Sequence, residues 1–345
     1  MTARRVTLPQ VADRAGVSLG SASRALNGNG ASPAMVARVR AAAEELGYQP
    51  DATGRSLRLR RTFQIAFAVA DIGNPVYVEM LTAIQEVVAD HGYRLLVATT
   101  GSTTDSTIAL VKGLSTGLVD GLVISPLRVN DALVDALRNA AMPVVVIGRS
   151  LDGESFDSVS TDSARGIGQA VAHVLQLGRR RIGFLNGPLD TTPGDARQRG
   201  FDTAVRREDF AADVVDAHVA QDFTVAAGLA GARELLGRHL TDGTPLDAIV
   251  AANDLLAIGA IKAARELGLR VPQDVAITGM DDTEIGRVFQ PSLSSVSLRS
   301  SERGRAAAEL LLGRLEEPGR PSRRAFVEPT LMARESTLEP EGVTA

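Results

Sequence analysis

The chain has 345 residues, of which 44% are hydrophobic, and a formal net charge of −4. This length suffices for two or three compact units, each with its own hydrophobic core. The sequence contains no cysteine, which excludes disulfides and thiolate chemistry, and its four histidines lack the spacing of metal ligands, so we expect no metal. We also expect a cytoplasmic protein, because no apolar run could span a membrane and the first residues lack the apolar segment of a secretion signal.

Charge is divided unevenly along the chain. Residues 1–61 carry ten arginines against four acidic residues, a net charge of +6, which leaves −10 for the remainder. A basic N-terminal part on an acidic body is typical of a protein in which only that part meets a polyanion such as DNA.

Two short helices joined by a tight turn are predicted near the N-terminus. Thr7 and Gln10 have the spacing of a capping box, and the apolar residues that follow recur on one helix face. Gly16 suits the positive φ of a turn, and Ser18 suits the N-cap of the second helix. The outer face of that helix is small or polar except for Leu19, as expected for a helix that enters the major groove. We interpret the pair as a helix-turn-helix.

A third helix is predicted to begin at Pro33, after the capping residue Ser32, and to end at Gly47. It completes a small all-α unit over residues 1–49. Residues 50–62 then form a basic segment with weak helix propensity, which we interpret as a linker.

From Phe63 onwards, short β-rich runs alternate with amphipathic segments. The runs FQIAFAVAD, YRLLVATT, GLVISP and PVVVIGR are expected to be buried parallel strands with helices between them. A second series of the same kind follows Asp162 and ends with VAITGMDD. This alternation predicts an α/β body of two doubly wound parallel-sheet lobes. The strand SLSSVSL, a helix over 300–313 and the strand RRAFVEPTLMARES are left over after them.

Polar side chains follow the carboxyl ends of several predicted strands, the edge at which open α/β sheets bind ligands. They include Asp71, Asn74 and Tyr77 after the first strand, Arg149 after the fourth, Asn253 after AIVAA and Asp281 after the last. Any single Asn or Asp here could be an ordinary helix N-cap. Their recurrence at successive strand ends favours a binding site.

The stretches VADRAGVSLGSASRALNG, EELGYQPD and RSLR, in that order and spacing, resemble the DNA-binding headpiece and hinge of the LacI/GalR family of bacterial regulators. The body resembles a periplasmic sugar-binding protein, so the resemblance covers nearly the whole chain. It implies a sequence-specific transcriptional regulator, a repressor, that binds double-stranded operator DNA under the control of a small molecule held between two lobes. The body would span 63–340, with lobe one about 63–162 and 292–322 and lobe two about 163–291 and 323–340.

For the DNA contacts, the resemblance and the helix faces together give Thr7, Ser18, Leu19, Gly20, Ser21, Ser23, Arg24, Asn27, Arg55 and Leu57. In the family the hinge folds into a helix only on operator DNA, where a leucine, here Leu57, wedges between base pairs. Asp51 and Gly54 replace the usual Asn and Ala and disfavour that helix. A solvated tether is the alternative for this segment.

For the effector, the resemblance adds Arg197 and Phe223 and supports Asn253 and Asp281. The candidate effector-binding residues are thus Asp71, Asn74, Tyr77, Arg149, Arg197, Phe223, Asn253 and Asp281. Such donors, acceptors and a flat ring suit sugar hydroxyls and the apolar face of a pyranose, which implies a sugar or sugar derivative. Phe223 could instead be core, and a nucleoside or purine is the alternative effector. Leu298 stands where several family members have a polar group.

No stretch presents a nucleophile with a base, a two-carboxylate site or a cofactor-binding loop, so we expect neither an enzyme nor a cofactor. A solute-binding receptor without a DNA function is the alternative of another class, opposed by the basic N-terminal part. The sequence lacks the C-terminal leucine heptad of fourfold assemblies in the family, so the resemblance implies a homodimer on a two-fold symmetric operator.

Overall fold

The computed structural model describes residues 6–26, 30–48, 61–148, 156–207 and 212–338. The chain divides into two compact units, residues 1–62 and residues 63–345. The predicted hinge residues 50–60 lie outside the described residues.

The first unit contains three helices, α1 (Leu8–Ala15), α2 (Leu19–Leu26) and α3 (Pro33–Glu45). They pack around the fully buried side chains of Val11, Ala22 and Val39. At the N-terminus of α1, the Thr7 backbone N–H donates to Gln10 Oε1 at 2.9 Å. Gly16 adopts φ 64°, a conformation that favours glycine, and turns the chain into α2. The predicted helix-turn-helix and third helix are confirmed.

The first lobe of the body is built on a six-stranded sheet with the order β11-β5-β4-β3-β1-β2. Its strands are β1 (Gln64–Val69), β2 (Arg94–Thr99), β3 (Gly121–Ser125), β4 (Val144–Gly148), β5 (Asp157–Ser160) and β11 (Arg324–Phe326). All neighbours are parallel, with Ile65 of β1 opposite both Leu95 and Gly121.

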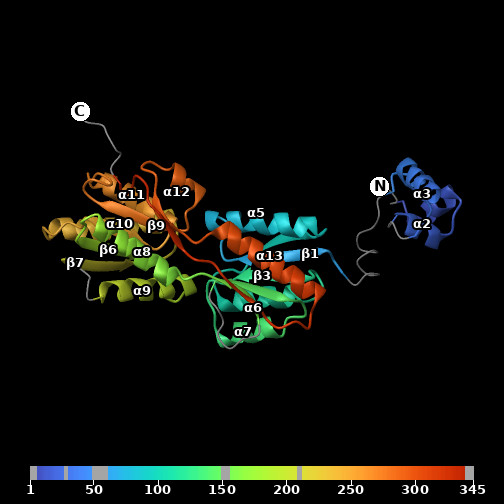
Figure 1. The fold of residues 1–345 in the computed structure, drawn as a ribbon, viewed down its shortest axis with the longest axis horizontal. Helices are drawn as coiled ribbons and strands as arrows, with labels where there is room; N and C mark the ends of the chain where they lie inside the picture. The colour runs from blue at the N-terminus through green and yellow to red at the C-terminus, as the bar shows by residue number, and fades with distance from the viewer. Residues whose placement is uncertain (1–5, 27–29, 49–60, 149–155, 208–211, 339–345) are drawn as a thin grey trace. The chain divides into compact units, whose positions relative to one another are not determined.

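Four helices cover the two faces of this sheet: α5 (Pro75–Asp90), α6 (Thr104–Leu114), α7 (Asp131–Arg138) and α13 (Ser300–Glu316). Figure 1 shows α5 and α13 side by side on one face, with α6 and α7 on the other. Successive residues of β1 therefore enter different cores: Phe67 packs with α5 and α13, whereas Ala66 packs with α6 and α7. Burial on both faces explains why β1, β3 and β4 are continuously apolar. The expected burial of β2 is wrong, because it is an edge strand in which Arg94, Val97 and Thr99 are exposed.

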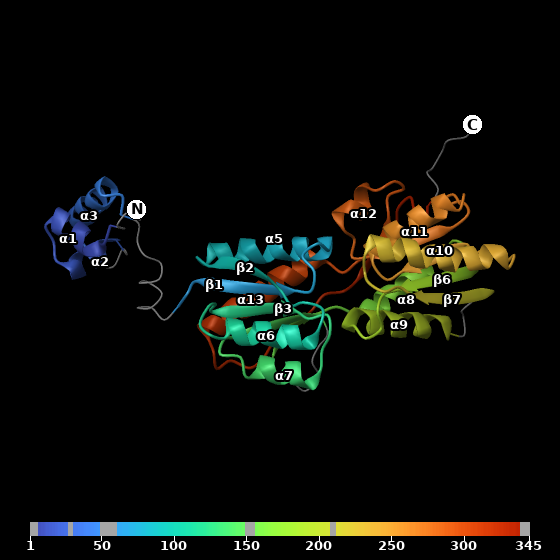
Figure 2. The same cartoon turned by 180° about the vertical axis from the view of Figure 1, so that it is seen from behind.

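The second lobe repeats the plan, with a six-stranded sheet in the order β12-β10-β9-β8-β6-β7. Its strands are β6 (Arg181–Asn186), β7 (Val214–Val219), β8 (Ala248–Ala251), β9 (Ala276–Met280), β10 (Ser294–Ser297) and β12 (Thr330–Met332), of which β12 runs antiparallel to β10. Its helices are α8 (Ser163–Gln176), α9 (Thr192–Val205), α10 (Val225–Thr241), α11 (Asp254–Glu266) and the short α12 (Glu284–Val288). In Figure 2, α8 pairs with α9 and α10 pairs with α11. The predicted fold class is confirmed.

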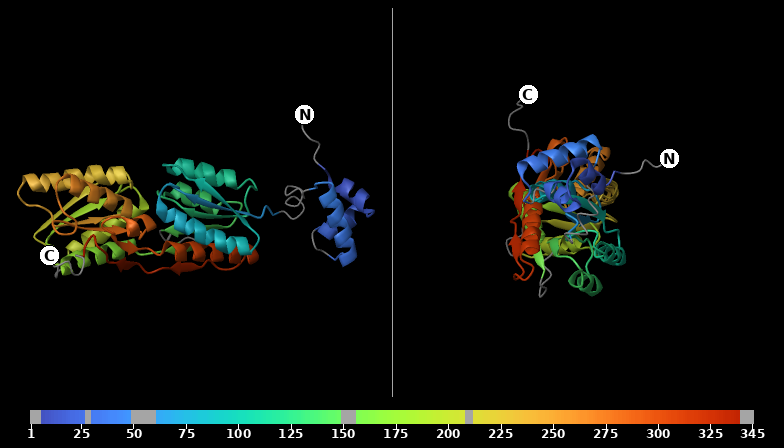
Figure 3. Two further views of the ribbon diagram at one scale, coloured as in Figure 1. Left: turned by 90° about the horizontal axis from the view of Figure 1, so that it is seen from above. Right: turned by 90° about the vertical axis from the view of Figure 1, so that its right-hand side faces the viewer.

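The predicted lobe boundaries near the C-terminus are wrong. Residues 292–322 were expected in lobe one, yet β10 pairs with β9 in lobe two, where the buried Ser294 Oγ lies 2.6 Å from Thr337 Oγ1. Residues 323–340 were expected in lobe two, yet β11 pairs with β5 in lobe one. The expected single strand is two short strands, because Pro329 between them lacks the N–H that a continuous strand needs. Figure 3 shows this red C-terminal chain passing from one lobe to the other.

Two strands, β5 and β7, were not predicted. The sequence of β5 is the polar run DSVS. Its Asp157 is buried and forms an ion pair with Arg314 of α13, a pairing that the sequence alone does not reveal. The edge strand β7 is only half-buried on alternate residues, which weakens its apolar pattern. None of the described helices combines the length and apolarity that a bilayer crossing requires.

Candidate functional site

The outer face of α2 in the first unit is open to solvent. Leu19 is 51% exposed although apolar, and Gly20 and Arg24 are also exposed. A side chain built at Gly20 would meet no atom within 4 Å, so this position can carry a longer residue without changing the fold. Ser21 and Ser23 lie half-buried on the same helix. The predicted contact face of α2 is therefore available for a major groove.

The two helix N-termini of the motif hold the remaining described candidates. Thr7 precedes α1 and Ser18 precedes α2, and both residues are exposed. The Ser18 Oγ accepts a hydrogen bond from the Ser21 backbone N–H at 3.2 Å, which caps α2. Helix N-termini of this kind suit DNA phosphates. Asn27, Arg55 and Leu57 lie outside the described residues.

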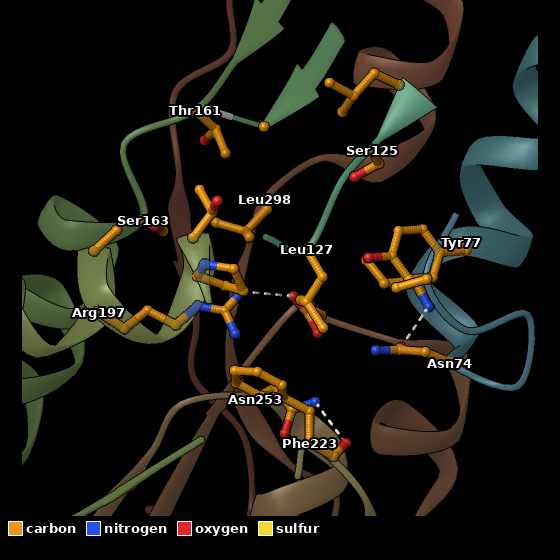
Figure 4. A pocket seen from close by; sticks show the side chains of 18 of the residues that line it. Asn74, Tyr77, Ser125, Leu127, Thr161, Ser163, Arg197, Phe223, Asn253 and Leu298 are labelled. Carbon is orange, nitrogen blue, oxygen red and sulfur yellow. Dashed lines mark hydrogen bonds and ion pairs between the residues drawn. The ribbon is translucent and has the colours of Figure 1, made fainter. Parts of the chain in front are cut away.

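In the body, a cavity of about 510 Å³ lies where the carboxyl ends of the two sheets meet. Seven of the eight predicted effector residues line it: Asp71, Asn74, Tyr77, Arg197, Phe223, Asn253 and Asp281. The eighth, Arg149, lies outside the described residues. In Figure 4, Tyr77 from α5 and Arg197 from α9 reach into the cavity from opposite sides. A cavity of this size is in the range of small-molecule sites.

A buried ion pair forms one wall of the cavity. Arg197 Nη2 lies 3.5 Å from Asp281 Oδ1, and the two residues are 7% and 5% exposed. Burial raises the pKa of Asp281 above its ordinary value of 3.8, while Arg197 and Arg303 act in the opposite direction. Arg197 Nε has no hydrogen-bond partner among the described residues. The pair thus keeps donor capacity for a ligand.

The backbone at the end of β9 is held in an unusual conformation. Asp281 and Asp282 have φ values of 115° and 55°, which residues other than glycine rarely adopt. The two carboxylates separate as a result: Asp281 lines the cavity, whereas Asp282 bonds Arg334 at 2.6 Å and also Arg287. Strain of this kind is typical of functional positions.

The two candidate asparagines are also helix caps. Asn253 Oδ1 accepts from the Leu256 N–H at 2.9 Å, and its Nδ2 donates to the Phe223 carbonyl at 3.2 Å. Asn74 Oδ1 accepts from the Val76 N–H at 3.2 Å. Each amide therefore has fewer free sites for a ligand than its side chain alone suggests.

Phe223 combines the two roles considered for it. Its ring belongs to the second-lobe core, yet it also lines the cavity, where the Arg197 guanidinium carbon lies 5.8 Å from the ring centroid. That arrangement is a cation–π contact, which orients the guanidinium. The ring fits here because Gly187 has no side chain, and a Cβ there would collide with it.

Several lining residues were not predicted as site residues, among them Ser125, Thr161, Ser163 and Arg303. Ser125 is the last residue of β3, Thr161 lies in the loop after β5 and Ser163 is the first residue of α8. Their small polar side chains carry no strong sequence signal. Arg303 did carry one, because it occupies the apolar face of α13 that continues through Ala307 and Leu311. An arginine at a buried helical position is unusual and points to a partner. No group of three potential metal ligands occurs among the described residues.

Residues 7–51 match the bacterial regulatory proteins of the lacI family, and residues 171–337 match a periplasmic binding protein-like domain. The transcriptional regulator CelR of Thermobifida fusca is 33% identical over 96% of this chain and 98% of its own length. A solved CelR–cellobiose complex has a TM-score of 0.70 with 33% identity, covering 96% of this chain and all of that one.

The solved lac repressor dimer, bound to operator and an anti-inducer, superposes with a TM-score of 0.85 at 25% identity, over 97% of this chain and 100% of that one. These relatives are transcriptional regulators. The three-helix first unit, hereafter called the headpiece, corresponds to the DNA-binding part of such a regulator, and the two-lobed body corresponds to the effector-binding part. The resemblance seen in the sequence is confirmed, and the chain belongs to the lacI family of bacterial regulatory proteins.

Proposed function

We propose that this DNA-binding repressor takes a sugar or sugar derivative into the cavity between its lobes. The observation that carries the proposal is the buried pair of Arg197 and Asp281 beside the Phe223 ring, since it offers charged donors and acceptors next to an apolar face. Adjacent hydroxyls and the face of a sugar ring require that combination. The complex of the relative CelR with cellobiose supports the same class of effector.

The two lobes contact each other through polar groups, and an effector could change these contacts. The Thr192 N–H of the second lobe donates to the Leu127 carbonyl of the first at 2.8 Å, and Arg128 pairs with Asp190 at 2.7 Å. Leu127 and Thr192 both line the cavity. A ligand that binds one arrangement of the lobes more tightly than another would shift the population of lobe arrangements and, through the linker, the DNA affinity.

At the DNA, α2 would enter the major groove with Leu19 and Gly20 facing base edges and Arg24 facing a base or phosphate. We assign the chain to the cytoplasm, where its operator lies, and expect a homodimer that matches a two-fold symmetric site. We assign no catalytic step to the cavity. Burial raises the pKa of Asp254 to about 7, but this residue is not part of the cavity lining. Its carboxylate accepts hydrogen bonds from the hydroxyl groups of Thr283 and Ser295.

The test uses full-length protein and a duplex obtained by binding-site selection. Operator affinity is measured by fluorescence anisotropy with cellobiose, ribose, glucuronate and adenosine added separately. The proposal predicts that at least one sugar or sugar derivative changes the operator Kd by about 5- to 150-fold, the usual range of allosteric coupling. A response to adenosine alone would assign the cavity to nucleosides instead, and no selected duplex at all would contradict the DNA-binding role.

A further inference from the structure

Two enclosed guanidinium groups face a single enclosed carboxylate in the cavity. Arg197 and Arg303 are 7% and 5% exposed, and Asp281 is 5% exposed. Asp281 lies within ion-pair distance of Arg197. Among the described residues, no carboxylate lies within that distance of Arg303.

Arg303 is held beside the cavity by the packing of its helix. It lies in the first turn of α13, where Gly304 is so close to α5 that a Cβ would lie 2.7 Å from the Met80 carbonyl oxygen. Among the described residues, the Arg303 side chain makes one hydrogen bond, which Nη2 donates to Ser300 Oγ at 3.3 Å. Its Nε has no hydrogen-bond partner among them. Met80 and Arg303 both line the cavity. The guanidinium is therefore fixed in place with donors unused.

The enclosed charge does not balance. The pKa of Arg303 falls to about 10, chiefly because of burial and further because of Arg197, although Asp281 and Tyr77 oppose the shift. A guanidinium with this pKa is still charged at neutral pH. The acidic residues at the cavity rim, Asp71, Asp162 and Asp222, are exposed, so water screens them. Among the enclosed residues that line the cavity, one positive charge is thus in excess, which is costly unless a partner supplies an anion.

We propose that the effector carries an anionic group, a carboxylate or a phosphate, that binds Arg303 and Arg197, while the rest of its hydroxylated skeleton contacts Asp281 and Phe223. A guanidinium group can donate two parallel hydrogen bonds to a carboxylate or a phosphate and carries the opposite charge. The N-terminus of α13, a 17-residue helix, adds a favourable dipole at the same place. The effector is then a sugar acid or a sugar phosphate. This inference rests on the proposed function, because it takes the same cavity as the effector site.

Thermal unfolding of the full-length protein at constant ionic strength tests this inference. The probes are glucuronate, glucose 6-phosphate, inorganic phosphate and neutral glucose. We expect one of the two acidic sugars to raise the unfolding midpoint at concentrations where glucose does not, because only ligand that binds the folded state stabilises it. Which of them acts distinguishes the carboxylate from the phosphate.

Three variants make the test specific to Arg303. Arg303→Met should weaken acidic-sugar binding on the order of 10- to 100-fold in Kd and should leave the ligand-free midpoint equal or higher, because an unpaired buried charge is removed. Arg303→Lys keeps the positive charge but loses the paired hydrogen-bond donors of the guanidinium, and it should retain part of the acidic-sugar binding. The control on the same helix is Arg314→Met, which breaks two hydrogen bonds to Asp157 and should lower the ligand-free midpoint without selective loss of acidic-sugar binding.

Two results would overturn the inference. One is an unchanged acidic-sugar response in Arg303→Met, and the other is an absence of stabilisation by every acidic probe, inorganic phosphate included. If glucose or cellobiose changed operator affinity while the acidic probes did nothing, the inference would be wrong but the proposed function would stand. If no probe of either kind changed operator affinity or the midpoint, both would be contradicted.

Discussion

Arg197 of α9 and Asp281 at the end of β9 form a buried ion pair with an Nη2–Oδ1 distance of 3.5 Å. That distance is too long for a strong charge-assisted hydrogen bond, which would measure about 2.7–2.9 Å. Both groups are nevertheless enclosed in the cavity wall, where water compensates poorly. The pair is therefore arranged so that a third group can complete the hydrogen bonding of each partner.

Removal of either partner should impair the effector response. Arg197→Ala and Asp281→Ala each remove a charged hydrogen-bonding group, a change of about 1.5–3 kcal/mol or one to two decades in effector Kd. Titration of the effector against the protein–operator complex measures this. The control is Arg233→Ala on α10, which removes the exposed ion-pair partner of Glu266 on α11 and should leave the titration midpoint unchanged. A parental response in both cavity variants would show that these residues do not contact the effector.

Close packing of α10 on α11 gives a stability prediction with a control in the same helix. A Cβ at Gly228 would lie 2.5 Å from the Leu256 carbonyl oxygen, whereas one at Gly237 would meet nothing within 4 Å. Gly228→Ala should therefore destabilise the body by about 1–3 kcal/mol, as overpacking does. Gly237→Ala should stabilise it by up to about 1 kcal/mol through helix propensity. Urea unfolding curves that ranked the two variants in the reverse order would contradict this packing.

Readout by the headpiece can be separated from attachment. Leu19 and Gly20 are exposed at the start of α2, so Leu19→Tyr with Gly20→Gln should fold normally and change the preferred half-site. Arginine contacts to phosphate should be unaffected, so the slope of log affinity against log salt should stay the same. Binding-site selection on both proteins measures the first effect. Recovery of an identical consensus from the two proteins would remove these positions from the base-reading surface.

Burial of Asp254 gives the body a pH dependence. Burial and the nearby Asp281 raise its pKa from 3.8 to about 7, so between these values the folded state binds a proton that the unfolded state has released. Its contribution to the free energy of unfolding should therefore fall as pH rises from about 4 to about 7, and should be constant at higher pH. The difference between the parent protein and Asp254→Asn isolates this contribution. A pH-independent difference across that range would mean that Asp254 is ionised throughout.

The sequence predicted best what depends on local pattern. Continuous apolar runs such as that around Phe67 predicted strands buried on both faces, and the Gly16 turn predicted the helix-turn-helix. Strand-end positions such as Asp281 followed from the rule that ligands bind at the carboxyl ends of parallel strands. Seven of the residues that line the cavity could thus be located before its geometry was known.

What depends on distant partners was missed. The polar strand β5 is buried because Asp157 meets Arg314 and Arg320, and β10 joins the second lobe partly because Ser295 bonds Asp254. Neither pairing leaves a periodic trace in the sequence. Arg303 was overlooked although its place on the apolar face of α13 was visible in the sequence, because its role depends on the cavity that the first turn of this helix faces.

Occupancy of the cavity should control DNA binding by the headpiece. The most direct measurement is the operator Kd of full-length protein, by fluorescence anisotropy on a selected palindromic duplex, as a function of added glucuronate, glucose 6-phosphate and cellobiose. We expect at least one of these compounds to change the Kd by about 5- to 150-fold, and Asp281→Ala to require on the order of 10- to 100-fold more compound for the same change. A compound that binds the body, as judged by calorimetry, while the operator Kd stays constant would contradict it.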